Sequence, residues 1–419
     1  MPLNTRAMKP FHLYLLGTGS WFLAFGIQSV MFAWLVTMVL HESPQMVGIA
    51  QMSMLVPTML LILVGGSLAD VIGGRRIILV AQSVAVLPPM LLCFAAWSGN
   101  LNFKAMLGYA VVMGLAQAFV TPARDGLLNQ VAEGGIQRAV VRASVMQFGV
   151  QLAGLAIASF AERVGPVPIL IAQAAVLALG VRFFSQIPDR PPPAEHTQRP
   201  LRDLGRSIAA GYRTIAASPS MRMTLLVSCA MGTCFMGSYI VTLPLLVREF
   251  YAGSASDLAL MNAANSLGLV TTILVLMRFG DIHRPGRALL VAQGIGALML
   301  GSIGLGVSFT VLLVLVCVWG MGGGIAMSMS RTIMQEQAPD DQRSRVMSFY
   351  SFAFMGSGPI GALLNGFAVQ WIGPRGALAL AAATMFTVIT LIASRSRLWQ
   401  VDPRMRDLHA SSAATASSE

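Results

Sequence analysis

The chain has 419 residues, of which 55% are hydrophobic and only 11% are charged, and its mean hydropathy is +0.70. This composition excludes an ordinary soluble protein, because apolar runs of about 20 residues, long enough to cross a bilayer, recur along the whole length. The net charge of +11 does not indicate a nucleic-acid-binding protein, since Lys and Arg lie in short segments between the apolar runs and not in one patch.

Residues that could support enzyme chemistry are sparse. The only lysines are Lys9 and Lys104, and neither lies in a G-x-x-x-x-G-K-[ST] pattern, so we expect no ATP binding. All four cysteines fall inside apolar runs without a nearby histidine cluster, which favours small buried side chains over a metal site or a disulfide. We therefore expect no enzymatic activity, no cofactor and no metal.

The first apolar run begins at Phe11 and extends to about Leu40, which is too long for the apolar region of a signal peptide. Only helices satisfy their own backbone in lipid at such lengths, so we predict an all-α membrane protein with 12 transmembrane helices. The predicted spans are 11–39, 46–68, 76–97, 104–121, 139–161, 167–186, 223–247, 258–279, 287–307, 309–330, 347–369 and 376–394.

Basic residues set the expected orientation. With a cytoplasmic N-terminus, 24 of the 28 Lys and Arg residues fall in cytoplasmic segments and 4 fall outside, as the positive-inside rule requires. This distribution also supports an even number of spans and therefore a cytoplasmic C-terminus. We expect the protein to lie in a bacterial inner membrane.

A short charged segment follows the second span. It runs from Gly66 to Leu79 and contains Asp70, Gly73, Arg75 and Arg76. A comparable segment, Thr121–Glu133, follows the fourth span and contains Arg124 and Asp125.

The middle of the chain, 187–222, carries Pro188 and the run 191–193, which predict the end of the sixth helix. Apolar residues at 201, 204, 208, 212 and 215 follow a helical spacing, with arginines off that stripe. This pattern predicts either an amphipathic helix on the inner membrane surface or a linker helix packed under the bundle.

The second half echoes the first. The segment around Asp281 is a degraded copy of the segment around Asp70, and Arg331 lies 207 residues after Arg124 in a similar setting. We therefore predict two pseudo-symmetric six-helix halves. The predicted domains are a cytoplasmic N-terminus 1–10, a first half 11–186, a linker 187–222, a second half 223–394 and a cytoplasmic tail 395–419 that is expected to be disordered.

The segment 66–79 resembles the loop between spans 2 and 3 of the major facilitator superfamily, whose pattern is G-x-L-x-D-x-x-G-R-[RK]-x-x-L. The matching residues are Gly66, Leu68, Asp70, Gly73, Arg75, Arg76 and Leu79, with Gly74 as an extra residue after the second glycine. Residues 121–128 resemble the P-A-R-x-x-L-L motif that ends the fourth span in the enterobactin-exporter-like, or transmembrane secretion effector, branch. That branch implies alternating access and efflux of small molecules.

The chain departs from drug:proton antiporters in two places. The fifth span has no Gly-Pro pair, and residues 105–120 of the fourth span contain no arginine. Both differences argue against a simple transfer of export and of proton coupling from those relatives.

The resemblance implies a conformational latch at the cytoplasmic face. Its predicted members are Asp70, Gly73, Arg75, Arg76, Arg124, Asp125, Asp281 and Arg331. The opposing interpretation is a positive-inside loop with one acid that balances its charge.

A substrate cavity is expected midway across the bilayer, where polar and aromatic residues interrupt the apolar spans. The candidates are Trp21, Phe25, Gln28, Gln51, Gln117, Gln147, Gln151, Ser238, Tyr239, Asn262, Asn265, Tyr350 and Phe354. Each of them could instead hold helices together through an interhelical hydrogen bond.

None of the 17 acidic residues falls near the middle of a predicted span. The sequence thus favours a large, partly apolar, hydrogen-bonding substrate, and we expect a monomeric exporter of siderophore-like or lipophilic molecules that works by proton antiport. The alternatives are an importer of a neutral metabolite and a membrane sensor that kept the fold without transport.

Overall fold

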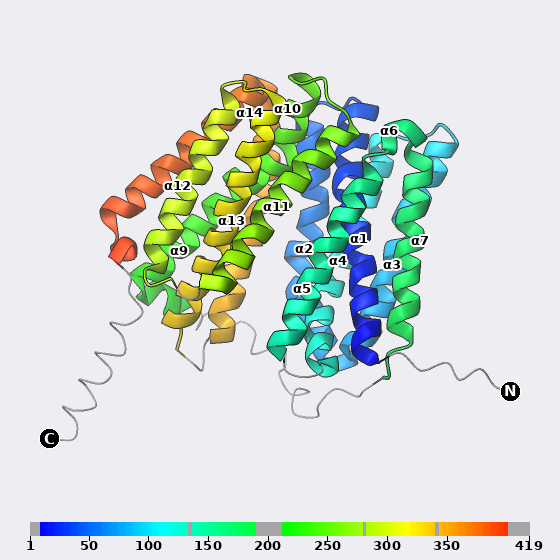
Figure 1. Ribbon diagram of the computed structural model, residues 1–419, viewed down its shortest axis with the longest axis horizontal. Coiled ribbons are helices and arrows are strands. Elements are labelled where there is room, and N and C mark those ends of the chain that lie inside the picture. Colours follow the sequence, from blue (N-terminus) through cyan, green and yellow to red (C-terminus); the bar gives the residue numbers. More distant parts are fainter. Residues whose placement is uncertain (1–8, 133–135, 190–211, 280–281, 340–342, 401–419) are drawn as a thin grey trace. The chain divides into compact units, whose positions relative to one another are not determined.

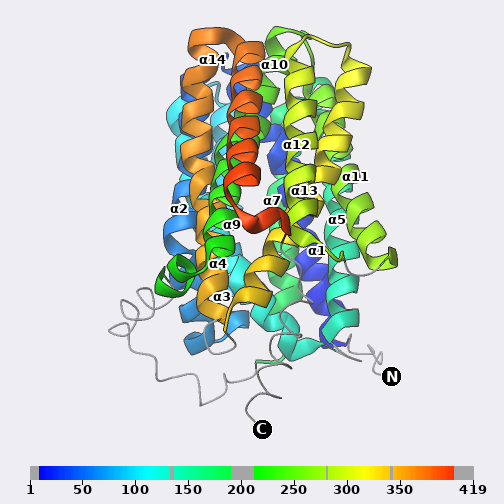
Figure 2. The same ribbon diagram turned by 90° about the vertical axis from the view of Figure 1, so that its left-hand side faces the viewer.

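The computed structural model describes residues 9–132, 136–189, 212–279, 282–339 and 343–400, and their regular secondary structure is entirely helical (Figures 1 and 2). Labels with α are α-helices, η1, η4 and η5 are π-helices, and η6 is a 3₁₀-helix. In chain order the elements are α1 (Pro10–Trp34), η1 (Leu35–Val39), α2 (Pro44–Ile72), α3 (Gly74–Trp97), α4 (Phe103–Val131), α5 (Ile136–Ala158), α6 (Ala161–Val164), α7 (Pro166–Ser185), α9 (Pro219–Ala230), η4 (Met231–Met236), η5 (Ser238–Thr242), α10 (Leu243–Glu249), α11 (Ala255–Phe279), α12 (Pro285–Gly304), α13 (Phe309–Gln337), α14 (Arg343–Arg395) and η6 (Arg397–Gln400).

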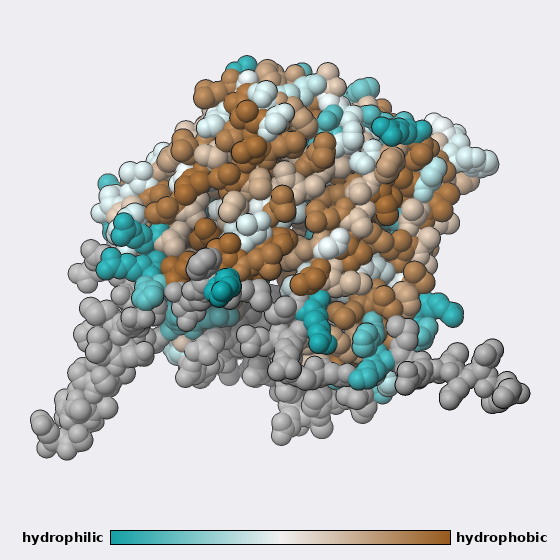
Figure 3. All heavy atoms as spheres, viewed as in Figure 1, coloured by the Kyte–Doolittle hydropathy of each residue, from teal (hydrophilic) through white to brown (hydrophobic). Residues whose placement is uncertain are grey.

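Ten of these helices or joined helices are long and apolar enough to cross a membrane. Their sides carry exposed apolar residues, such as Leu267 and Leu274 on α11 and Leu298 on α12, each more than half exposed. Figure 3 shows apolar residues over the sides of the helices, with hydrophilic residues mainly toward the helix ends. The multi-pass membrane class is confirmed, whereas the count of twelve spans stays a prediction.

Three helices extend further at the predicted cytoplasmic end than their apolar runs suggest. The segment 66–79 resembles a loop between two spans, but α2 continues to Ile72, so Asp70 lies within this helix. Only Gly73, with φ of 101°, separates α2 from α3. Likewise, α4 and α13 continue through Arg124 and Arg331. Hydropathy marks where lipid ends, and these helices continue beyond that point because their polar last turns still hydrogen-bond internally.

The chain forms two compact units. Unit 1 contains residues 1–199 and 243–263, and unit 2 contains residues 200–242 and 264–419. In unit 1, α1 packs against α5 and α7, α2 against α4, and α3 against α4 and α7. In unit 2, α14 packs against α9, η4, η5 and α12, and α12 against α13. The predicted domain bounds stay a prediction.

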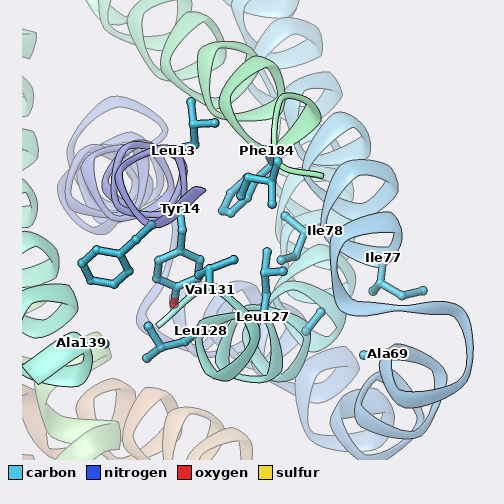
Figure 4. Close-up of a cluster of buried hydrophobic side chains, with 13 residues drawn as sticks. Leu13, Tyr14, Ala69, Ile77, Ile78, Leu127, Leu128, Val131, Ala139 and Phe184 are labelled. Carbon is cyan, nitrogen blue, oxygen red and sulfur yellow. The ribbon is translucent and has the colours of Figure 1, made fainter. Parts of the chain in front are cut away.

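An apolar cluster joins the helices of unit 1 near the predicted cytoplasmic end. Residues from α1, α2, α3, α4, α5 and α7 contribute to it. Figure 4 shows Tyr14 of α1, Leu127 of α4 and Phe184 of α7 pointing toward one another, and the Tyr14 and Phe184 rings meet edge to face at 6.4 Å. This cluster holds the α2–α3 turn next to the end of α7.

Glycines set the closest helix crossings. A Cβ on Gly26 of α1 would overlap the backbone of Gln151 on α5, and a Cβ on Gly154 of α5 would overlap the backbone of Leu23 on α1. In unit 2, a Cβ on Gly361 of α14 would similarly meet the carbonyl oxygens of Gly232 and Thr233 in η4. Small residues allow helices to approach this closely in membranes.

Candidate functional site

The α2–α3 turn is tied to the end of α7 within unit 1. Arg75 Nη2 donates a hydrogen bond of 2.6 Å to the carbonyl oxygen of Ser185. Arg76 forms a fork on one carboxylate oxygen of Asp189, with distances of 2.9 Å from Nε and 2.7 Å from Nη2. Cationic side chains at the carboxyl end of a helix interact favourably with its dipole. The two arginines therefore connect the start of α3 to the end of α7 and the segment after it.

Among the residues whose burial the structure describes, Arg124 is the one charged residue that is buried. Its guanidinium carbon lies 4.6 Å from the ring centre of Phe22 on α1. Arg124 Nη2 lies 3.5 Å from Oδ1 of Asp125. The Arg124 side chain is 11% exposed, whereas that of Asp125 is 69% exposed. The cation thus lies between an aromatic face and a hydrated carboxylate, which lowers the cost of its burial.

The structure brings together only some of the predicted latch residues. Arg75 and Arg76 contact α7 and the segment after it, whereas Arg124 contacts Phe22 and Asp125. Arg331 is exposed on α13. The side chain of Asp70 and the whole of Asp281 lie outside the described residues, so the latch stays a prediction.

The cavity candidates of unit 1 combine buried and half-buried side chains. Gln28 is 4% exposed, and its Nε2 lies 3.1 Å from the sulfur of Met54 on α2. Asn262 is 9% exposed and donates to the carbonyl oxygen of Leu258 on its own helix at 2.8 Å. Trp21 is buried. The half-buried candidates are Phe25, Gln51, Gln117, Gln147 and Gln151.

The unit 2 candidates include side chains that already have partners. Ser238 is fully buried, and its hydroxyl donates to Oδ1 of Asn365 at 3.0 Å. The half-buried Tyr239 meets the Trp319 ring edge to face at 6.1 Å. Asn265 lies 3.5 Å from the carbonyl oxygen of Val316.

The remaining two unit 2 candidates lie on α14. Tyr350 is 4% exposed and belongs to an apolar cluster with residues of α9 and α13. Phe354 is half-buried. The ring of Tyr350 thus has a packing role within unit 2, whereas Phe354 is only partly covered.

Sequence reasoning missed Asn365, the centre of a polar network in unit 2. Its Oδ1 also accepts from Thr242 at 2.9 Å, and its Nδ2 donates to the carbonyl oxygens of Thr233 and Gly361 at 3.2 and 2.9 Å. The network lies against η4 and η5, where π-helical turns leave backbone groups that a side chain can reach. An amide inside an apolar run was the available signal, and Asn365 was passed over.

Two glutamines of unit 1 were missed for the same reason. Gln82 on α3 donates to Ser20 Oγ at 3.2 Å and to the carbonyl oxygen of Leu177 at 3.0 Å. Gln173 on α7 donates to the Tyr109 hydroxyl at 2.7 Å. Both glutamines are fully buried. Their bonds connect α3 to α1 and α7, and α7 to α4.

His, Cys, Asp and Glu residues are scattered over the part of the chain that the structure describes. No group of three or more His, Cys, Asp or Glu residues lies close enough to hold a metal ion there. The cysteines Cys93, Cys229, Cys234 and Cys317 are free thiols.

Comparisons with known proteins agree with this architecture. The chain is similar to the solved nucleoside transporter NupG, with 13% identity, a TM-score of 0.74 and coverage of 92% of this chain and 99% of that one. It is also similar to a POT family transporter solved in complex with 5-aminolevulinic acid, with 12% identity, a TM-score of 0.69 and coverage of 92% and 96%.

A third similar structure is the human organic anion transporter MFSD10 (TETRAN), with 15% identity, a TM-score of 0.64 and coverage of 94% and 100%. At such identities the similarity shows the fold alone. No curated protein matches the sequence. The family described as transmembrane secretion effector matches residues 15–416. The chain is therefore a multi-pass transporter of the major facilitator superfamily and belongs to the transmembrane secretion effector family.

Proposed function

We propose that the protein is a secondary active exporter that works by alternating access on a siderophore-like or lipophilic small molecule. The observation that carries the export direction is the match of residues 15–416 to a family described by secretion. Proton antiport is the coupling we propose for it. The acidic residues available for proton coupling are Asp70, Asp125, Glu249 and Asp257.

We propose twelve spans for this carrier. The ten candidate spans count α14 once, although Gly373 interrupts it with a non-helical φ of 72°. Division of α14 at Gly373 gives one further span, and the 23-residue helix α5, Ile136–Ala158, supplies the other. An even count places both termini on one side, which the basic segments assign to the cytoplasm of a bacterial inner membrane.

The proposed substrate follows from the polar groups of unit 1. Its candidate side chains on α1, α2, α4 and α5 are amides and aromatic rings, and its buried cation, Arg124, already has an aromatic and a carboxylate neighbour. Neutral amides can donate to and accept from a substrate without a net charge. They suit a large molecule with apolar surface and several hydrogen-bonding groups.

A second candidate function is import of a neutral metabolite. The observation that favours it is the fold similarity to NupG, which is described as a nucleoside transporter. Neutral amides also suit such a substrate. A sensor without transport is the third possibility, and measured flux separates it from both carriers.

The test is proton movement in energised everted vesicles that contain the protein. The panel comprises catecholate siderophores, lipophilic drugs and neutral nucleosides, with Asp70→Asn as the control for the cytoplasmic latch. We expect substrate-dependent proton release with the unchanged protein and strongly reduced release with Asp70→Asn at equal membrane level. Substrate movement in the direction opposite to export would support import. The absence of flux with every compound would contradict a carrier.

A further inference from the structure

Residues 243–263 form a hairpin, here called the outer hairpin, that consists of α10, a short loop and the first turns of α11. This hairpin belongs to unit 1, although the chain before it and after it belongs to unit 2. Helix α11, Ala255–Phe279, thus begins in one unit and ends in the other. Whatever holds the outer hairpin therefore acts on the first turns of α11, whose later residues belong to unit 2.

Arg248 of α10 makes the first contact that holds the hairpin. Its Nη1 donates to the carbonyl oxygens of Thr37 and Glu42 at 3.1 and 3.0 Å. Its Nη2 lies 2.5 Å from Oε1 of Glu249. The Arg248 side chain is only 20% exposed and Thr37 is fully buried. Removal of the guanidinium would leave the Thr37 carbonyl without its charged donor, in a site that water reaches poorly.

The position of Thr37 explains why its carbonyl accepts a bond from outside the helix. Thr37 lies in the π-helix η1, which ends at Val39, and the last carbonyls of a helix have no partner within it. A cation at that end also interacts favourably with the helix dipole. Arg248 therefore acts as a cap that α10 supplies to the end of the first span.

Glu162 makes the second contact. Its Oε1 accepts a hydrogen bond of 3.2 Å from the backbone N–H of Ala255, the first residue of α11. A carboxylate at the amino end of a helix satisfies a free N–H group and is stabilised by the dipole. Glu162 lies in α6, so the hairpin is held at both of its helices.

The two loops at these contacts carry the chain's positive-φ residues other than glycine, among the described residues. They are His41, with φ of 50°, before α2, and Ala252, with φ of 45°, between α10 and α11. Such backbone conformations are unfavourable without a compensating constraint. Arg248 bonds the carbonyl of Glu42, next to His41, and Glu162 bonds Ala255, three residues after Ala252, so each contact lies beside one of these loops.

We propose that Arg248 and Glu162 are positioning residues of an outer latch that holds the outer hairpin on unit 1 in one state of the transport cycle and releases it in the other. The proposal rests on the proposed alternating-access function. The partners of the latch residues are backbone carbonyls for Arg248 and a helix N–H group for Glu162. The counter-ion of Arg248 is Glu249 on its own helix, so the loop after the first span need not supply one.

Arg375 provides a matched control, because it makes the same kind of contact without the hairpin. Its Nε and Nη2 donate to the carbonyl oxygens of Gly304 and Leu305 at 3.0 and 2.7 Å, at the end of α12. These residues all belong to unit 2. Arg375→Gln therefore removes an arginine cap of a helix end that includes no residue of the outer hairpin.

The experiment measures the distance between spin labels at Asn100→Cys and Ser256→Cys, two exposed positions of unit 1, with the native cysteines replaced. In lipid nanodiscs, we expect Arg248→Gln to raise the ratio of long to short distances about tenfold, as loss of a charge-assisted hydrogen bond implies. Glu162→Ala should shift the ratio in the same direction by less. Arg375→Gln should leave the distances unchanged.

An unchanged distance distribution in both Arg248→Gln and Glu162→Ala would overturn the latch, and so would an equal shift in Arg375→Gln. Arg248→Lys keeps the charge but has one nitrogen in place of the two that bond the carbonyls and Glu249, so it should give an intermediate ratio. If Arg248→Gln fails to fold, the Glu162→Ala comparison decides. The distance measurement needs no substrate, so a shift without flux would refute the proposed transport and leave the latch standing.

Discussion

The same helix crossing is built in two ways in this protein. In unit 1, α1 and α5 meet at Gly26 and Gly154, and both helices keep α geometry there. In unit 2, α14 meets η4 at Gly361, which lies 207 residues after Gly154, the same separation as Arg124 and Arg331. The second crossing has π-helical turns on one side.

The difference shows what a side chain can add to a glycine crossing. The π-helical turns of η4 and η5 leave the Thr233 carbonyl within reach of Asn365. Asn365 also accepts hydrogen bonds from the hydroxyls of Ser238 and Thr242, so one amide bonds three groups of the facing segment. The first crossing brings two backbones together at Gly26 and Gly154, whereas the second adds the polar side chain of Asn365 to its backbone contact.

The largest effect should come from Gly154→Val, which breaks the first crossing. Its Cβ would overlap the backbone of Leu23, and a backbone clash cannot be relieved by a rotamer change. Overpacking of this kind costs about 1–3 kcal/mol or more, so we expect loss of monodisperse protein or a markedly lower thermal midpoint in detergent. Gly361→Val should do the same to the second crossing.

Gly149→Val is the matched control, because Gly149 lies on α5 too and a Cβ there would meet nothing within 4 Å. Its midpoint should stay close to that of the unchanged protein. Equal midpoints for the Gly154 and Gly149 variants would show that the crossing does not require glycine.

A smaller effect is expected for Asn365→Leu, which affects only the second crossing. The Thr233 carbonyl would lose a donor, while Ser238 and Thr242 could turn to carbonyls of their own segment. A buried group left without a partner costs about 1–3 kcal/mol, and no backbone clash is added to it, so the thermal midpoint should fall less than with Gly361→Val.

Thr387→Val on α14 is the control for Asn365→Leu, since the exposed Thr387 hydroxyl bonds only within its own helix, to Ala383. We expect no change in its midpoint. If Asn365→Leu melted like Thr387→Val, the amide network would contribute nothing and the two crossings would be equivalent.

Local sequence patterns predicted the fold class because lipid imposes a simple rule. Every apolar run of about 20 residues must be helical, so a hydropathy pattern alone locates the spans. Their ends were less predictable, since α4 and α13 continue past the apolar limit through Arg124 and Arg331. The polar contact at η4 was not predictable, because Asn365, whose amide bonds the Thr233 carbonyl, lies more than a hundred residues away in the sequence.

The candidate site was predictable only in kind. The sequence marks polar residues such as Gln28 and Ser238 inside apolar runs, but it cannot say which ones face a substrate and which ones bond another helix. Ser238 bonds Asn365, and Gln28 contacts Met54, so each already has a neighbour. Arg248 was counted only as one of the few outer cations, since its acceptors are backbone carbonyls that no side-chain pattern reveals.

The smallest expected effect concerns the bond between Gln173 and Tyr109, which gives unit 1 a polar contact away from its glycine crossing. Gln173 Nε2 donates to the Tyr109 hydroxyl at 2.7 Å, but Gln173 Oε1 has no partner. Gln173→Leu removes a bond and an unsatisfied oxygen together, so the two changes offset each other. A double-mutant cycle with Tyr109→Phe should give a coupling of about 0.6 kcal/mol, as for other hydrogen bonds in membranes. A coupling above that of Asn365 with Ser238 would reverse the comparison, because unit 1 would then depend more on polar contacts than unit 2.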